Sequence, residues 1–246
     1  MRDIPMLYSA PMVRALWNDW KTQTRRLGFD VPPQPEADCH PRNKPRHPAP
    51  YLDSYCSERK TSANPRGMSV NWCWWQVDDR QCLPTFKLKA KPGDRIWVRE
   101  TWKPTGLTAF NKPSETRICG RFAYQADEQQ ERRDEMIPWR PSIHMPRWAS
   151  RMTLIVTDVR VERLQDISAA DAIAEGIERH GSGWMPYSTA FLQSDGVTPA
   201  NYHQDPRESY RSLWNKINGT GAWETNPWVA AYTFRVIKQN IDRVQA

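Results

Sequence analysis

The sequence predicts an α+β fold, a small mixed β-barrel or sheet with flanking helices and two long loop insertions. The clearest evidence is the segment at 151–164, where apolar and polar residues alternate as they do in a half-buried strand. The chain also contains 21 Pro and 13 Trp among its 246 residues, which favours a loop-rich domain over a helical bundle. Three other segments carry the residues that typically start a helix.

The first predicted helix covers residues 10–20. Ser9 suits the N-cap, and Pro11 falls in the first turn, where its missing N–H leaves no hydrogen bond unmade. One face of this helix is apolar and consists of Met12, Val13, Leu16, Trp17 and Trp20. The helix is therefore expected to pack this face against the rest of the domain.

Four strands follow from the alternation of residue types. A turn at Lys91-Pro92-Gly93-Asp94 precedes a predicted strand at 95–102, and a shorter strand is predicted at 122–126. In the long strand at 151–164, residues Thr157, Val159 and Val161 share one face, opposite Asp158, Arg160 and Glu162. The last strand is expected at 228–237.

Two more helices have clear boundaries. Ser168 and Asp171 form a capping box that opens a helix running through Glu175, and Gly176 stops it. The sequence Asp205-Pro206-Arg207-Glu208 opens another helix, which continues to about residue 217. Its apolar face consists of Tyr210, Leu213, Trp214 and Ile217.

The segments at about 28–91 and 178–204 have the composition of insertions with little regular structure, so we expect one domain over residues 1–246. Cys39, Cys56, Cys73 and Cys82, with His40 and His47, lie in the first insertion and could hold a zinc ion. No Cys-x-x-Cys pair is present, so we predict no metal and no cofactor.

The formal charge of +7 and the abundance of aromatic residues suit a nucleotide or a single-stranded nucleic acid. No apolar run approaches the length of a membrane span, so we expect no membrane partner. Because residues 1–5 also lack the apolar stretch of a signal peptide, we expect a cytoplasmic protein with reduced thiols. The oligomeric state does not follow from the sequence.

The segment Lys21-Thr22-Gln23-Thr24-Arg25-Arg26 gathers two hydroxyls, one amine and two guanidinium groups. An amine beside a hydroxyl can activate a weak oxygen nucleophile, and arginines can bind phosphate or a planar polar group. Basic residues are also common at the end of a helix, where they complement its dipole. We expect Arg26 to lie on a pocket wall or to bind an anion, and Arg25 to lie on the solvated surface.

Five segments together resemble one family. They are the 9–20 helix with its basic extension, the Gly93-to-Glu100 turn and strand, the 151–164 strand, the 167–176 helix and the 228–237 strand. This combination resembles the ASCH domain, a β-barrel related to the PUA fold of RNA-binding proteins, in the decorated form that phages and prophages encode. The resemblance covers the scattered core and neither insertion.

One small bacterial branch of that family hydrolyses N4-acetylcytidine to cytidine and acetate. It uses a Lys, a Thr three residues later, and a Glu on the helix after the long strand. The resemblance places these roles on Lys21, Thr24 and Glu175. Asp171 and Glu178 are close in sequence to the last of these positions.

This assignment is chemically coherent for amide hydrolysis. Thr24 would attack the acetyl carbonyl, and Lys21 would accept the proton if burial or the nearby arginines lower its pKa. A Lys21 that stays protonated would instead stabilise an oxyanion. Glu175 could hold the N4 edge of cytosine, orient Lys21, or relay a proton to the leaving amine.

Further residues are candidates for binding a base or a phosphate group. The loop at 139–148 holds His144 and Arg147 between two Trp, while Arg99 and Trp102 lie at the end of a predicted strand. Other ASCH branches bind or cleave RNA, so fold alone does not establish the activity. The alternatives are a non-catalytic RNA- or DNA-binding module of phage origin and a ribonuclease, with RNA expected over DNA.

Overall fold

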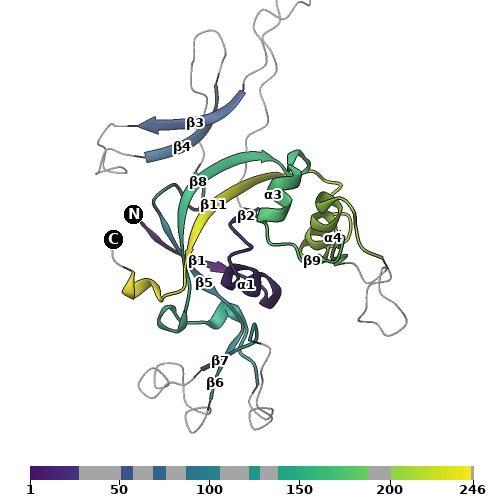
Figure 1. The fold of residues 1–246 in the computed structure, drawn as a ribbon. Helices are drawn as coiled ribbons and strands as arrows, with labels where there is room; N and C mark the ends of the chain where they lie inside the picture. Colours follow the sequence, from purple (N-terminus) through teal and green to yellow (C-terminus); the bar gives the residue numbers. More distant parts are fainter. Residues whose placement is uncertain are drawn as a thin grey trace, which may run out of the picture.

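The centre of the protein is a five-stranded sheet with the order β1-β5-β8-β11-β2. Strands β1 and β5 are parallel, and all the other neighbours are antiparallel. The long curved strands β8 and β11 cross the middle of Figure 1, and the two chain ends lie on the same side of the molecule. The strands span β1 (Asp3–Leu7), β2 (Gln23–Arg26), β5 (Arg95–Arg99), β8 (Thr153–Arg163) and β11 (Trp228–Ile237). The computed structural model describes residues 1–27, 51–57, 69–75, 87–105, 122–127, 138–187 and 201–244.

The α+β class is confirmed, but the expected closed barrel is not seen. Within the described ranges β1 and β2 are the two edges of the sheet, and they do not pair with each other. One side chain joins them, since Arg26 Nη2 on β2 donates a hydrogen bond of 2.7 Å to the carbonyl oxygen of Leu7 on β1. The sheet curves until its edges approach each other and remains open between them.

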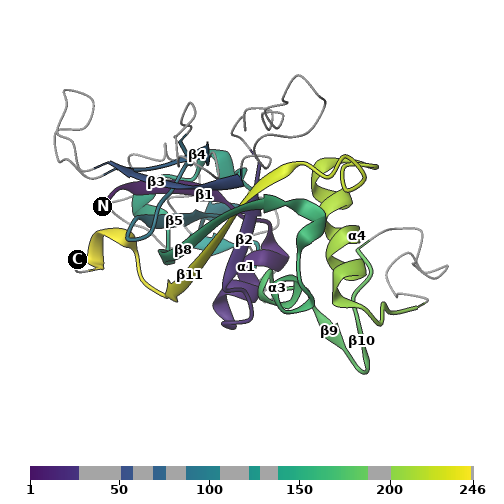
Figure 2. The same cartoon turned by 90° about the horizontal axis from the view of Figure 1, so that it is seen from above.

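Three helices lie beside the sheet, as the capping residues predict: α1 (Ala10–Trp17), α3 (Ala169–Ala174) and α4 (Pro206–Asn218). Ser168 Oγ accepts a hydrogen bond of 3.0 Å from the amide of Asp171, and Asp205 caps α4 in the same way. Figures 1 and 2 both place α3 beside α4. Helix α1 ends earlier than expected because Asp19 adopts a φ of 59°, which turns the chain out of the helix.

The basic segment at 21–26 is not a helix end. Residues Gln23–Arg26 form β2, which pairs antiparallel with β11 so that Thr24 lies opposite Tyr232. The first strand, β1, is likewise absent from the sequence prediction. Both strands are short, and their pairing with distant segments decides their conformation, which local propensity does not reveal.

The long strand β8 contains a bulge that shifts its inward face. Val156 pairs with Phe234 and Asp158 with Thr233, so that Thr157 is an extra residue in the ladder. Leu154 and Val156 are buried before the bulge and Val159 after it. The predicted face of odd-numbered residues is therefore correct only beyond the bulge.

Short strands surround the central sheet. The expected strand at 95–102 divides into β5 and β6, and β6 pairs with β7 at the place of the strand predicted at 122–126. The first insertion contains a paired hairpin, which corrects the expectation of little regular structure. These peripheral strands are β3 (Tyr51–Ser57), β4 (Ser69–Trp75), β6 (Trp102–Pro104), β7 (Phe122–Tyr124), β9 (Arg179–His180) and β10 (Gly183–Trp184).

One large apolar core lies between the sheet and the helices, with Val13, Leu16, Ile96, Leu154 and Tyr232 among its buried members. Four turns of 3-10 helix complete the described structure: η3 (Ser142–His144), η4 (Arg147–Ala149), η5 (Leu164–Asp166) and η7 (Ile241–Arg243). Among the described helices, none combines the length and the apolar character that crossing a bilayer requires.

Candidate active site

Lys21 and Glu175 meet where the start of β2 lies against the end of α3. Glu175 is the C-cap of α3, and it forms an isolated antiparallel bridge with Lys21. The amide of Thr22 also donates a hydrogen bond of 2.9 Å to the carbonyl oxygen of Ala174. These backbone contacts fix the two side chains although 154 positions separate them in the sequence.

The Lys21 amine forms a buried ion pair with Glu175. Its Nζ donates to Glu175 Oε2 at 2.8 Å and to the Glu175 carbonyl oxygen at 2.6 Å. The exposed fractions of the two side chains are 2% and 4%. Burial lowers the pKa of the Lys21 amine, and the neighbouring carboxylate only partly offsets that effect.

Gly176 allows this close approach. It follows the helix cap with a φ of 81°, a left-handed conformation that favours glycine. A Cβ at this position would lie 2.7 Å from Lys21 Cβ and 2.8 Å from Ala15 Cβ. The glycine that ends α3 therefore also makes room for the Lys21 side chain.

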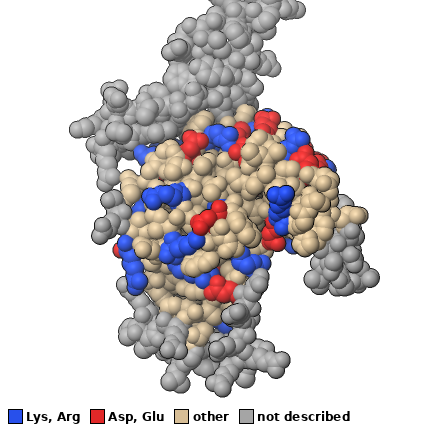
Figure 3. All heavy atoms as spheres, viewed as in Figure 1, with Lys and Arg blue, Asp and Glu red and all other residues tan. Residues whose placement is uncertain are grey.

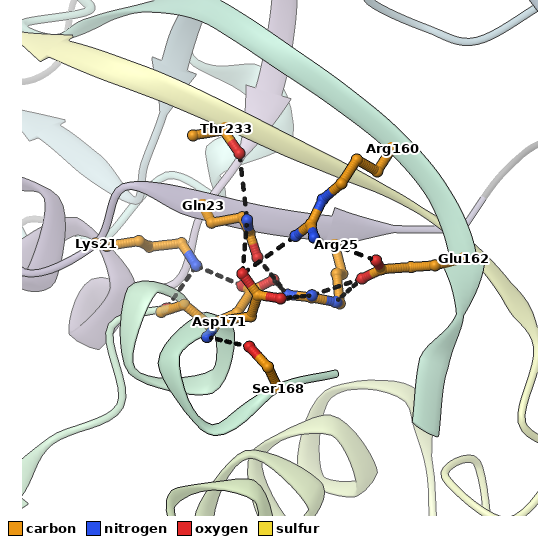
Figure 4. Close-up of polar contacts among 9 residues, drawn as sticks. Lys21, Gln23, Arg25, Arg160, Glu162, Ser168, Asp171 and Thr233 are labelled. Atoms are coloured by element: carbon orange, nitrogen blue, oxygen red, sulfur yellow. Dashed lines mark hydrogen bonds and ion pairs between the residues drawn. The ribbon is translucent and has the colours of Figure 1, made fainter. Parts of the chain in front are cut away.

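Arg25 is the centre of the polar network shown in Figure 4. Its side chain has an exposed fraction of 0%, which corrects the expectation that it lies on the solvated surface. It donates to Glu162 Oε1 at 2.6 and 3.0 Å, to Gln23 Oε1 at 2.6 Å and to Glu175 Oε1 at 3.2 Å. Arg25 and Lys21 thus each bind one oxygen of the same carboxylate.

A second layer of contacts holds Arg25 in place. Asp171 Oδ2 lies 3.3 Å from Arg25 Nη2, and Asp171 Oδ1 lies 3.1 Å from Arg160 Nη2 (Figure 4). Gln23 Nε2 donates to both Asp171 and Thr233 at 3.2 Å. Arg25 and Arg160 also lie opposite the small Ala231 on β11, which leaves space for Arg25 to reach Glu162 on β8.

Lys21, Thr24 and Glu175 all line one pocket of about 420 Å³, a size suited to a small ligand. The structure brings Lys21 and Glu175 into direct contact. Thr24 lines the same cavity, but among the described residues no hydrogen bond joins its hydroxyl to Lys21 or Glu175. Apolar and aromatic side chains form a large part of the wall, chiefly Tyr8, Met12, Tyr210, Leu213 and Trp214.

Two tyrosines and Arg26 complete the polar wall. Burial raises the pKa of Tyr8 to about 12, and burial raises the pKa of Tyr210 well above its usual value, so both hydroxyls stay protonated at neutral pH. Tyr210 also lies close enough to Glu175 for a hydrogen bond to contribute to that shift. Arg26 lies over the Tyr8 ring at 4.8 Å from its centroid, on the pocket wall as expected.

The other predicted binding residues have structural contacts. Trp102 is completely buried in a small aromatic cluster, so its ring is not available to stack on a base. Arg147 pairs with Asp3 at 2.6 Å and Asp242 at 2.8 Å. His144 is exposed on η3 and does not line the pocket, whereas Arg99 donates to carbonyl oxygens of η3 at the pocket edge.

Sequence reasoning did not place at the site the acids that surround Arg25, and it predicted helix α4 without its role in the pocket wall. Glu162 and Arg160 were assigned to the polar face of a strand, and that alternation was the available signal. Asp171 was identified only as a capping residue and as an alternative to Glu175. Tyr210 lies on an apolar helix face, which gave no sign of the carboxylate beside it.

A zinc site is not supported by the described residues, among which no group of three or more His, Cys, Asp and Glu could hold a metal ion. Cys73 is buried. The Cys56 side chain, Cys39, Cys82, His40 and His47 lie outside the described structure.

Comparison of the chain with protein-family models, with curated proteins and with solved structures finds no match. The assignment of a function therefore rests on the residues and their geometry.

Proposed function

We propose that this protein hydrolyses the N4-acyl amide of a modified cytosine. The observation that carries this proposal is the buried Lys21–Glu175 pair, with Nζ and Oε2 2.8 Å apart, in the wall of a pocket that Thr24 also lines. A desolvated amine and a hydroxyl in one cavity are the groups that acyl transfer to an oxygen nucleophile needs.

We also propose that the chain is a decorated ASCH domain of the PUA-like type. The segments that carry that resemblance supply α1, β2, β5, β8, α3 and β11. The four strands belong to the central sheet, and the pocket is lined by residues of α1 and β2 and by the C-cap of α3. The three positions that the resemblance singles out are Lys21, Thr24 and Glu175. Glu175 lies 154 positions after Lys21, and all three line the same cavity.

In the proposed reaction, Thr24 Oγ attacks the acyl carbon and its proton passes to the neutral amine of Lys21. The resulting ammonium delivers the proton to the cytosine N4 as the carbon–nitrogen bond breaks, which releases the cytosine and leaves an acyl-threonine ester. Water then attacks the ester and gives one proton to Lys21, which passes it to Thr24 Oγ as the ester carbon–oxygen bond breaks. This step releases the carboxylic acid and restores the Thr24 hydroxyl and the neutral Lys21 amine. One water is consumed for each amide cleaved.

Of the three roles considered for Glu175, the contacts favour orientation of Lys21. Both carboxylate oxygens bind cations, Oε2 the Lys21 amine and Oε1 the Arg25 guanidinium. The Glu175 carbonyl oxygen accepts a second hydrogen bond from Lys21, at 2.6 Å. With two protons of its amine so directed, Lys21 has a defined orientation toward the substrate.

The test is turnover of N4-acetylcytidine, followed by the release of cytidine and acetate. Thr24→Val keeps the shape of the side chain and removes the nucleophile, so kcat is expected to fall by about a hundredfold or more. Thr24→Ser retains a hydroxyl and should recover part of the activity. Thr22→Ala is the matched control, because Thr22 is exposed and two residues away.

Three results would separate the alternatives. Turnover that survives Thr24→Val would refute the nucleophile and leave the reaction class standing. Absence of turnover on any N4-acylated cytosine, with salt-sensitive binding to RNA, would replace the hydrolase with a binding module. Cleavage of the RNA itself would indicate a ribonuclease.

A further inference from the structure

The charges in the pocket wall are balanced except at Arg26. Glu175 neutralises Lys21, and Glu162 and Asp171 surround Arg25. Arg26, in contrast, contacts the carbonyl oxygen of Leu7 and the ring of Tyr8. Burial raises the pKa of Tyr8 to about 12, so its hydroxyl is neutral at physiological pH and provides no counter-charge. Among the described residues, Arg26 Nε is also buried with no hydrogen-bond partner.

Two further cations lie near Arg26 and have no acidic partner among the described residues. Arg99 donates to the carbonyl oxygens of Ser142 and Ile143, and its guanidinium lies 5.3 Å from the centre of the Trp97 ring. Lys89 is exposed as a whole residue. Partial desolvation of its amine, together with the charges of Arg26 and Arg99, lowers its pKa. Lys89 thus lies within electrostatic range of both arginines.

The backbone places Arg26 and Arg99 at the edge of the pocket. Leu7, whose carbonyl oxygen binds Arg26, pairs with Arg99 in the sheet and lines the cavity. Ser142, whose carbonyl oxygen binds Arg99, lines the same cavity. The amide of Tyr8 donates to the Arg99 carbonyl oxygen at 2.9 Å, which fixes β1 against β5 at this point.

Grouping like charges without acids is unfavourable unless an anion binds between them. Arg99 and Arg26 are also held by neutral acceptors, which orient their guanidinium groups and leave their charge uncompensated. Acidic and basic side chains are interspersed on the face shown in Figure 3, with blue groups over its middle. The contacts described for Arg26 and Arg99 differ from that pattern because they are made to carbonyl oxygens and aromatic rings and not to acids.

We propose that Arg26, Lys89 and Arg99 form a phosphate subsite at the edge of the pocket, so that the ligand is a phosphorylated cytosine nucleotide and not a free nucleoside. The base would enter the cavity beside Lys21 and Thr24 while the phosphate binds this cluster. The identity of the base rests on the proposed function, whereas the anion subsite does not. A free 5′-phosphate and the phosphodiester of a polynucleotide offer the same oxygens to these residues.

The first experiment compares KM for N4-acetylcytidine with KM for its 5′-monophosphate. The phosphate should lower KM about tenfold or more, since hydrogen bonds between a cation and an anion are markedly stronger than those between neutral groups. Lys89→Ala should bring the ratio of the two KM values measurably closer to one, because it removes one of the three cations. Arg235→Ala, which removes one exposed positive charge from β11, is the control and should leave the ratio intact.

A binding experiment separates failure of the subsite from failure of the proposed reaction. Cytidine and cytidine 5′-monophosphate are titrated by calorimetry into the wild type and Lys89→Ala, with no turnover required. Tighter binding of the monophosphate, lost in Lys89→Ala, would support the subsite even if no amide is cleaved. Equal affinity for both ligands, or equal KM for both substrates, would overturn it whatever the activity.

The two sources of phosphate are distinguished with a short single-stranded oligonucleotide that carries one N4-acetylcytosine. A KM for the oligonucleotide lower than for the monophosphate, and rising steeply with salt, would assign the subsite to a polynucleotide backbone. A higher KM would assign it to a free nucleotide. Arg26→Gln should weaken whichever phosphate ligand binds more tightly, and an unchanged affinity in that variant would refute the role of Arg26.

Discussion

Replacing Arg25 by Met should destabilise the protein far more than removing a charged side chain from the surface does. The substitution keeps an unbranched chain of similar length and removes the guanidinium from the centre of the network. Glu175 would then lose one of its two cationic partners, and Gln23 and Glu162 would lose hydrogen bonds of 2.6 Å. The Arg25 side chain has an exposed fraction of 0%, so water cannot readily replace the hydrogen bonds that are lost.

The magnitude follows from that burial. Removing one partner of a buried ion pair typically costs about 3–5 kcal/mol, because it leaves an uncompensated charge in a poorly solvated place. For a chain of 246 residues, each kcal/mol lowers the melting temperature by about 2–4 °C. The expected decrease is therefore about 6–20 °C.

Arg160→Met is the matched control, since Arg160 pairs with the same two acids, Asp171 at 3.1 Å and Glu162 at 3.7 Å. Its side chain has an exposed fraction of 43%, so solvent replaces much of the interaction and the cost should stay within about 1 kcal/mol. Both variants lose one positive charge from the same region.

The assay is urea unfolding at neutral pH, with the free energy of unfolding of each variant compared with that of the wild type, and thermal unfolding as a second measure. Similar losses for Arg25→Met and Arg160→Met would refute the reasoning, because burial would then not set the cost. A normal stability for Arg25→Met would show that the network contributes nothing net.

Other predictions concern backbone conformation and titration. Gly176→Ala should lower the free energy of unfolding by roughly 2–5 kcal/mol, because the left-handed φ of 81° disfavours alanine and the new Cβ clashes with Lys21 Cβ. Gly93→Ala is the control, since Gly93 has a similar φ of 84° but open space around it, and it should cost about 1–2 kcal/mol. Equal losses in urea unfolding would exclude the clash. Burial raises the pKa of Tyr8 to about 12 from an ordinary value of 10.0, so the stability that its protonated hydroxyl contributes, roughly 3 kcal/mol, is complete below pH 10 and is lost as pH rises through 12. Tyr8→Phe should accordingly unfold with a weaker dependence on alkaline pH than the wild type, and identical curves would contradict the shift. If Lys21 is the proton acceptor, kcat/KM should rise with pH and reach a plateau that begins below pH 10.5, because burial lowers the pKa of this amine. A kcat/KM that falls over the same pH range would indicate that Lys21 is protonated and stabilises an oxyanion.

Much of the local structure could be predicted because its signals are local. The cap at Ser168, the stop at Gly176 and the N-cap at Asp205 correctly bounded α3 and α4. Strand β11 was predicted with its observed limits. Strands β1 and β2 were missed because their residues pair with segments far away in the sequence, and no local pattern records that pairing.

The sequence by itself determined the chemical character of residues 21–26 and the helix that ends at Glu175. It could not show that these segments meet, because the contact depends on β2 pairing with β11 and on the bridge between Lys21 and Glu175. The tertiary structure alone decided that Arg25 is buried among acids and that Arg26 is not. Alternation along one strand sends neighbouring arginines to opposite faces, and only the packing of α3 and β1 determines what each face meets.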